Sequence, residues 1–171
     1  MWTKIRPYVG FSALALLVGG LSSVITQGEM EAFSALRQPP LSPPGWVFPV
    51  AWTILYLLMG IGMAIVWRRS DGERRRRAVK LWGVQLGVNF LWPLLFFLWK
   101  QRLLSLALLV VLLVLVAKMT SEFEKSSVAA ARLQIPYLLW LLFASVSPFC
   151  QKRGLMVLHQ SPSWDDLTGI I

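Results

Sequence analysis

The sequence predicts an all-α integral membrane protein, a bundle of five transmembrane helices, and three observations support this fold class. Hydrophobic residues make up 56% of the 171 residues and charged residues only 15%, unlike the mixture of an ordinary soluble domain. The apolar residues are gathered in long runs, and residues 103–117 carry no charge at all. Lys, Arg and Trp flank these runs, as they flank membrane-spanning helices.

The first predicted span covers residues 6–25 and has Lys4 and Arg6 at its start. A charged start followed by an apolar run is also typical of a signal peptide, but this run is long for one and no clean small-residue cleavage site follows it. Residues 26–45 form the first predicted loop. It ends in a proline-rich segment, which cannot be the interior of a helix because each proline lacks a backbone donor. The second predicted span, residues 46–67, follows directly.

An arginine-rich loop is predicted at residues 68–80, before a third span at residues 81–99. The link at residues 100–102 is so short that a fourth span, residues 103–119, must run antiparallel to the third. A small charged loop leads to the fifth span, residues 128–149, where Pro136 predicts a kink. Residues 1–150 thus form one membrane domain, and the polar tail at residues 151–171 is predicted to be disordered.

The positions of the basic residues predict the orientation of the chain. With the N-terminus in the cytoplasm, 12 of the 17 Lys and Arg residues fall on inner segments and 5 on outer ones. The positive-inside rule favours that orientation, and the net charge of +9 is then a topology signal that also meets anionic headgroups, with no nucleic acid as a partner. Without a targeting extension, the pattern favours a bacterial inner membrane over an organelle membrane.

Several kinds of chemistry lack the residues they need. The eight acidic residues fall outside the predicted spans, so no membrane-embedded carboxylate is available for a proton or cation pathway. The single histidine, His159, lies in the tail without neighbouring ligand residues, and no metal-ligand spacing occurs. No Ser-His-Asp set or glycine-rich phosphate loop is present. We therefore expect no metal site, no required cofactor and no hydrolytic active site.

The spans are rich in aromatic side chains. Five of the nine tryptophans lie at predicted membrane borders, where an interfacial belt explains them: Trp2, Trp46, Trp67, Trp82 and Trp99. Trp52, Trp92 and Trp140 lie deeper, about 9 to 13 Å from the outer ends of their helices at about 1.5 Å per residue. These three indoles either line one outward-opening pocket or fill space between packed helices.

The third span has two distinct faces. Gln85, Asn89, Trp92 and Phe96 follow i, i+4, i+7, i+11 spacing and share one face. The two amides on it either face a cavity or form helix–helix hydrogen bonds. Gly83 and Gly87, on the opposite face, form a small-xxx-small pair, which predicts either a homodimer interface or a close contact with the first or fourth span.

Taken together, three segments resemble the TspO/MBR family, the tryptophan-rich sensory or translocator proteins. They are Pro43-Pro44-Gly45-Trp46 leading into the Ala-Trp-Thr-Ile-Leu-Tyr of 51–56, the Gln-Leu-Gly-Val-Asn-Phe-Leu-Trp-Pro of 85–93, and the Pro-Tyr-Leu-Leu-Trp of 136–140 with Phe143-Ala144. The resemblance implies a five-helix bundle, usually dimeric, that binds porphyrins such as protoporphyrin IX in a pocket beneath the first loop. The implied ligand-binding positions are Phe33, Trp46, Trp52, Asn89, Trp92, Trp140 and Ala144.

The chain also departs from the family pattern. The Trp-Tyr pair before the proline loop is Ala32-Phe33 here, and the tryptophan inside the proline motif is Leu41, so polar or stacking groups are missing. Beyond Ala144 the chain lacks the aromatic and charged pattern that the family links to sterol recognition. We therefore do not expect sterol binding.

The sequence predicts a membrane receptor or carrier that binds a porphyrin or another planar apolar ligand and has a sensory or transport role. A homodimer is expected. One alternative implied by the resemblance is an enzyme-like role, light- and oxygen-dependent porphyrin breakdown, with Trp52 and Trp140 as redox partners. Another is a structural membrane module that binds no small ligand.

Overall fold

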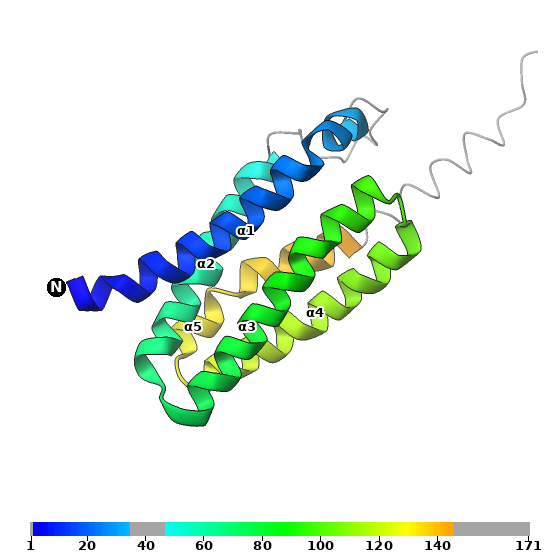
Figure 1. The fold of residues 1–171 in the computed structure, drawn as a ribbon. Coiled ribbons are helices and arrows are strands. Elements are labelled where there is room, and N and C mark those ends of the chain that lie inside the picture. The colour runs from blue at the N-terminus through cyan, green and yellow to red at the C-terminus, as the bar shows by residue number, and fades with distance from the viewer. Residues whose placement is uncertain (1, 35–46, 146–171) are drawn as a thin grey trace, which may run out of the picture.

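The computed structural model describes residues 2–34 and 47–145, and these residues form a bundle of helices (Figure 1). The helices are α1 (Trp2–Ser34), α2 (Val47–Arg69), α3 (Gly72–Pro93), α4 (Arg102–Glu124) and α5 (Val128–Arg132). A π-type segment, η1 (Leu94–Leu98), extends α3, and residues 135–145 form a further helical stretch after α5. Five stretches of this described part are long and apolar enough to cross a membrane, which confirms the predicted fold class.

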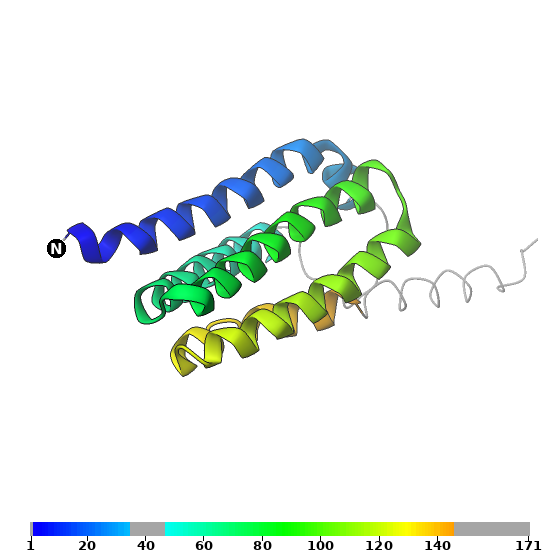
Figure 2. The same cartoon turned by 60° about the horizontal axis from the view of Figure 1, so that its bottom comes forward.

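The bundle has its apolar side chains on the outside as well as in the core. Both views show α3 and α4 side by side, with the α2–α3 and α4–α5 links at the same end as the N-terminus (Figures 1 and 2). Large apolar side chains such as Val24 and Leu103 are 73% and 80% exposed, as expected of surfaces that contact lipid. The fully buried core includes Met59, Leu112 and Tyr137.

The basic stretch between the second and third spans is helical, so the prediction of an arginine-rich loop was wrong. α2 continues through Arg69 and α3 begins at Gly72, which leaves only residues 70–71 as a link. Gly72 has φ 49°, in the left-handed region that glycine adopts without strain, and this allows so tight a turn. The arginines at 74–77 therefore project from the first turns of α3.

The predicted C-terminal ends of the first and fourth spans were also too early in the sequence. α1 continues to Ser34, well past residue 25, and α4 continues to Glu124, past residue 119. Glu122 is therefore a helical residue near the end of α4, and its Oε2 lies 2.6 Å from Lys125 Nζ. Polar residues with good helix propensity continue both helices beyond the apolar run that a hydropathy pattern detects.

Trp82, which was predicted to lie at a membrane border, packs between helices rather than on the outer surface of the bundle. Its side chain is only 3% exposed and packs edge-on against Phe11, with ring centroids 5.3 Å apart. This indole therefore serves as a contact between α1 and α3.

The fifth span is interrupted just before Pro136. α5 ends at Arg132, residues 133–134 form a turn, and the helix resumes at residue 135. The turn buries Gln134, whose Nε2 donates to the carbonyl oxygens of Leu58, at 3.3 Å, and Ala130, at 3.4 Å. Pro136 has no backbone N–H to donate to the preceding turn. The side-chain amide of Gln134, next to the break, instead bonds the fifth span to α2.

Gly62 and Gln134 are expected to be energetically coupled. A Cβ on Gly62 would collide with Gln134 Nε2 and displace the amide from Leu58. Gly62→Ala and Gln134→Ala should each lower stability by about 1 kcal/mol, whereas the double variant should lose clearly less than the sum. Thermal unfolding of the purified protein in one detergent measures this coupling, and strictly additive losses would contradict it.

Candidate ligand-binding site

A cavity of about 250 Å³ lies in the half of the bundle where α1 ends and α2 begins. Residues from all five spans line it: Gly19, Gly20, Ser22, Ser23, Thr26, Pro49, Trp52, Thr53, Tyr56, Asn89, Trp92, Pro93, Phe97, Leu109, Trp140, Leu141 and Ala144. Because each span contributes only a few residues, the cavity depends on the packing of the whole bundle.

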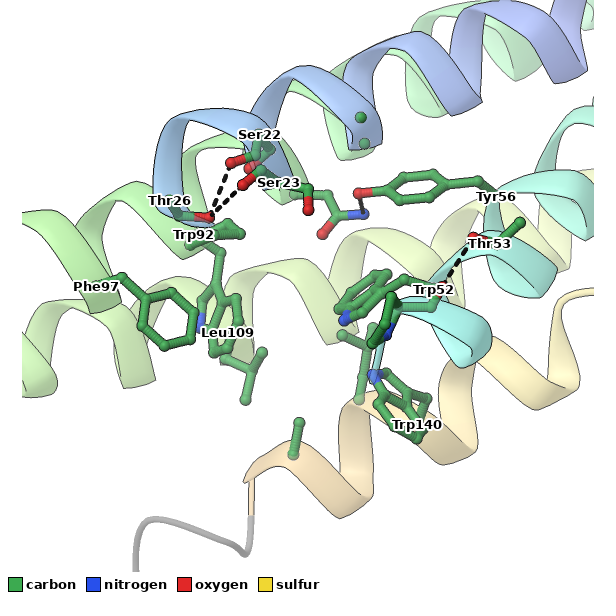
Figure 3. A pocket seen from close by; sticks show the side chains of 17 residues that line it. Ser22, Ser23, Thr26, Trp52, Thr53, Tyr56, Trp92, Phe97, Leu109 and Trp140 are labelled. Atoms are coloured by element: carbon green, nitrogen blue, oxygen red, sulfur yellow. Dashed lines mark hydrogen bonds between the residues drawn. The ribbon is translucent and has the colours of Figure 1, made fainter. Parts of the chain in front are cut away.

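Two aromatic walls face each other across this cavity (Figure 3). One wall carries Trp52 and Trp140, and the other carries Trp92 and Phe97. Trp52 and Trp140 contact each other edge-on, with ring centroids 6.3 Å apart and an interplanar angle of 79°. A space bounded by aromatic rings on two sides is suited to a flat apolar molecule, which gains stacking and dispersion contacts on both faces.

Neighbouring aromatic rings hold the wall tryptophans in place. The Trp52 ring lies 5.6 Å from the Tyr56 ring and 6.3 Å from that of Tyr137. On the other wall, Trp92 stacks on Phe96 at 5.4 Å, with an interplanar angle of only 14°. Their side-chain rotamers are thus restricted before any ligand enters, which lowers the entropy cost of binding.

The π-type turn after Pro93 decides which phenylalanine reaches the cavity. The Trp99 backbone N–H donates to the Leu94 carbonyl oxygen at 3.1 Å, a five-residue step wider than the α-helical one. This wider turn shifts the register, so Phe97 lines the cavity while Phe96 supports Trp92 from behind. Regular α-helical spacing had predicted Phe96 on the cavity face.

The polar side chains of the cavity carry no formal charge among the lining residues that the structure describes. Several hydroxyl groups donate to backbone carbonyls: Thr26 Oγ1 to Ser22 O at 2.9 Å, and Thr53 Oγ1 to Pro49 O at 2.8 Å. Ser22 Oγ lies 3.4 Å from Phe90 O and links α1 to α3. The hydroxyls therefore offer mainly lone pairs to a ligand, and nothing in the described wall would neutralise a carboxylate.

Asn89 is an almost fully buried amide of the cavity wall, with 1% of its surface exposed. Its Nδ2 donates to the Tyr56 hydroxyl at 3.3 Å, while its Oδ1 has no hydrogen-bond partner among the described residues. One turn away, Gln85 faces the bundle core, where its Oε1 accepts from the Tyr137 hydroxyl at 3.2 Å. The two predicted amides thus have different environments, and only Asn89 borders the cavity.

The structure places five of the seven predicted ligand-binding residues on this cavity: Trp52, Asn89, Trp92, Trp140 and Ala144. Phe33 belongs to the last turn of α1, but the contacts of its side chain lie outside what the structure describes, and so does all of Trp46. Sequence reasoning missed Tyr56, although it stands one helical turn after Trp52. It also missed Ser22 and Thr26, because serine and threonine on a membrane helix give no distinctive signal.

Gly83 and Gly87, the predicted dimer-interface residues, are exposed on the outer surface of α3. A Cβ on either glycine would meet no atom within 4 Å of it. They do not mediate a close contact between α3 and another described helix, and they line a separate groove instead.

The fold and the cavity define a helical membrane protein with five spans and an aromatic cavity that is uncharged in its described part. The sequence profile of the TspO/MBR family matches residues 11–150, and the chain belongs to that family.

Relatives from animals, archaea and bacteria match most of the chain. The chain is 35% identical to the translocator protein of Bos taurus over 143 residues, which cover 82% of this chain and 85% of that protein. It is 35% identical to the tryptophan-rich protein TspO of Archaeoglobus fulgidus over 140 residues, 81% of this chain and 90% of the relative. The tryptophan-rich sensory protein of Cereibacter sphaeroides is 35% identical over 115 residues, 67% and 71% of the two chains.

Proposed function

We propose that this protein binds a planar apolar ligand, a porphyrin such as protoporphyrin IX, between the two aromatic walls of the cavity, as a membrane receptor or carrier. The observation that carries the proposal is the opposition of Trp52 and Trp140 to Trp92 and Phe97 across one uncharged cavity (Figure 3). The names of relatives, which include translocator and sensory proteins, support a transport or sensory role.

The size and charge of the cavity constrain how such a ligand binds. At about 250 Å³ it lies just below the range of about 300 to 1,000 Å³ typical of small-molecule sites. We therefore expect the cavity to hold an aromatic ligand of two or three fused rings, and a tetrapyrrole to enter by one edge. The carboxylates of a porphyrin remain outside, because burying them against uncharged walls would cost several kcal/mol.

Quenching of tryptophan fluorescence tests this function. Protoporphyrin IX and an uncharged isoquinoline should each quench the purified protein saturably, with one ligand per chain, and each should compete with the other. Linear, non-saturable quenching by both compounds would contradict the proposal and favour a structural module without a small ligand.

Asn89→Leu is expected to weaken protoporphyrin IX binding by about 3- to 10-fold. The substitution keeps the side chain's size but removes the cavity's most buried amide and its hydrogen bond to Tyr56, worth about 1 kcal/mol. The same quenching titration measures the change. Gln85→Leu is the matched control, since Gln85 lies one turn away but does not line the cavity, and an equal loss there would indicate general disruption.

A second candidate function is oxidation of the bound porphyrin by light and oxygen, favoured by the contact between Trp52 and Trp140. Illumination of the complex in air should then bleach the porphyrin absorbance faster than that of free porphyrin. Trp52→Phe and Trp140→Phe should abolish the excess bleaching while binding persists. Equal bleaching with and without protein would contradict this second function, and the carrier or receptor function would be the one that still stands.

We also propose that the N-terminus is cytoplasmic, in a bacterial inner membrane. The arginines of α2 and α3, from Arg68 to Arg77, lie at the same end of the bundle as the N-terminus, which supports this orientation under the positive-inside rule. A green fluorescent protein fused to the N-terminus should fluoresce, and an alkaline phosphatase fused there should be inactive. The reverse pattern would place this end outside.

A further inference from the structure

The cavity between the aromatic walls is open on one side of the bundle. Its lining residues from α3, η1, α4 and the fifth span are all buried or half-buried. The exposed residues of the described lining belong to α1 and α2: Gly20, Ser23, Pro49 and Thr53. Figure 3 shows Ser23 and Thr53 on the α1 and α2 sides of the space. We name the gap between these four residues the α1–α2 opening.

The same two helices are in close contact next to the opening, toward the end of the bundle that carries the arginines. A Cβ on Gly19 would collide with the Tyr56 ring, and one on Gly60 would collide with the backbone of Ser12. At Gly20, by contrast, a Cβ would meet no atom within 4 Å. The seam between α1 and α2 is therefore closed toward the arginine-rich end and open beside the cavity.

The surroundings of the opening are those of a surface in contact with lipid. Leu17 and Val24 on α1 and Val50 and Ile54 on α2 are large apolar side chains with much of their surface exposed. Both edges are intact helices, whose backbone groups are bonded within each helix, so a gap between them exposes no free backbone group to hydrocarbon. The Thr53 hydroxyl is likewise satisfied within α2, by a bond to a backbone carbonyl.

The opening lies within the membrane-spanning part of both helices. Gly20 is eight residues from Gly28, the end of the first candidate span, and Thr53 is four residues from Pro49, the start of the second. At about 1.5 Å per residue, they lie about 12 and 6 Å inside the span ends. One leaflet has a hydrocarbon depth of about 15 Å, so the opening faces the hydrocarbon of the leaflet opposite the arginine-rich end.

We propose that ligands enter and leave the cavity sideways, from the hydrocarbon of this leaflet, through the α1–α2 opening. This inference rests on the proposed function, because it concerns how the ligand of that cavity arrives. It also narrows the class of ligand to flat molecules that dissolve in the membrane and pass the opening as uncharged rings. A tetrapyrrole that enters by one edge fills the opening itself and keeps its carboxylates toward the headgroups.

The amide behind the opening supports a ligand route over a packing defect. Asn89 lines the cavity and is 1% exposed, and its Oδ1 has no hydrogen-bond partner among the described residues. A buried acceptor without a partner is costly in an apolar interior, and a ligand N–H or O–H group that reaches the cavity would satisfy it.

Gly20→Leu tests the route through the rate of ligand release. Leucine meets no neighbouring atom at this position and places a bulky side chain at the edge of the opening. The probe is an uncharged isoquinoline, bound to the protein in lipid nanodiscs and then diluted into excess empty vesicles, with release followed by the recovery of tryptophan fluorescence. Release from Gly20→Leu should be about fivefold slower than from the unaltered protein, whereas a substitution that only damaged the cavity would speed release.

Two further variants control this experiment. Gly28→Leu makes the same change at an equally open glycine of α1 that does not line the cavity, and it should alter the release rate by less than about twofold. Thr53→Leu obstructs the opening from α2 and should also slow release, so it keeps the test available if Gly20→Leu does not fold. Unchanged or faster release from the folded variants would overturn the proposal.

A spin label at residue 20 tests the opening without any ligand. Gly20→Cys, in a chain whose single cysteine is removed by Cys150→Ser, carries the nitroxide. In nanodiscs the label should be relaxed by oxygen, which concentrates in hydrocarbon, and not by a water-soluble nickel complex. Relaxation by the nickel complex would place the opening in water and overturn the proposal. If the unaltered protein shows no saturable quenching, the proposed function fails, and the label still decides whether the opening faces lipid.

Discussion

Trp92→Ala is expected to weaken binding of protoporphyrin IX by about 5- to 150-fold. Trp92 forms one aromatic wall with Phe97, and stacking of a flat ring on an aromatic side chain is worth about 1 to 3 kcal/mol. The loss should be large because Trp92 already stacks on Phe96, so little side-chain entropy is lost when its ring contacts a ligand. Equilibrium dialysis, followed by porphyrin absorbance, measures the affinity without relying on tryptophan fluorescence.

Trp99→Ala is the matched control for this experiment. It removes the same side chain six residues beyond Pro93, but Trp99 is 59% exposed and does not line the cavity. Trp92→Phe should recover most of the affinity, because a smaller aromatic ring still provides a wall. Binding by Trp92→Ala within twofold of the unaltered protein would mean that the porphyrin does not stack in this cavity.

Gly60→Ala is expected to lower the free energy of unfolding by about 3 kcal/mol, or the apparent melting temperature by about 6 to 12 °C. Gly60 lies where α2 crosses α1, and a Cβ there would come within 2.6 Å of the Ser12 backbone nitrogen. Since the obstacle is backbone rather than a flexible side chain, α1 must move as a whole. The same movement would shift Ser22 and Thr26 in the cavity wall and weaken ligand binding.

Gly10→Ala separates this packing effect from the helix propensity of alanine. A Cβ on Gly10 meets no atom within 4 Å, so alanine there should leave stability unchanged or raise it by up to about 1 kcal/mol. Differential scanning fluorimetry of both variants in one detergent compares them. Equal melting temperatures for the two variants would show that α1 and α2 are not in close contact at Gly60.

Most of the fold could be predicted from the sequence because a long apolar run in lipid must form a helix. A helix is the only single segment that satisfies its own backbone in hydrocarbon, so five such runs predict five spans. The helix ends could not be predicted in the same way. The arginines at 74–77 are polar, and a hydropathy pattern assigns polar residues to loops, yet arginine is a good helix former and these residues continue α3.

The candidate site could be predicted in part for a similar reason. Trp52, Asn89 and Trp140 are costly or bulky groups to place against lipid, so their presence within spans indicated an interior position, and all three line the cavity. Phe97 could not be predicted, because the π-type turn that rotates it inward depends on how η1 packs. Tyr56 faces the cavity at a point where α1 has Gly19, and only the structure reveals that this glycine makes room for the ring.

The position of a bound protoporphyrin IX ring in a structure of the complex tests the central claim most directly. We predict that an edge of the ring lies between Trp52 and Trp140 on one side and Trp92 and Phe97 on the other, within van der Waals contact of both walls. A porphyrin on the lipid-facing surface of the bundle, with these four side chains packed together and no ligand between them, would contradict the account.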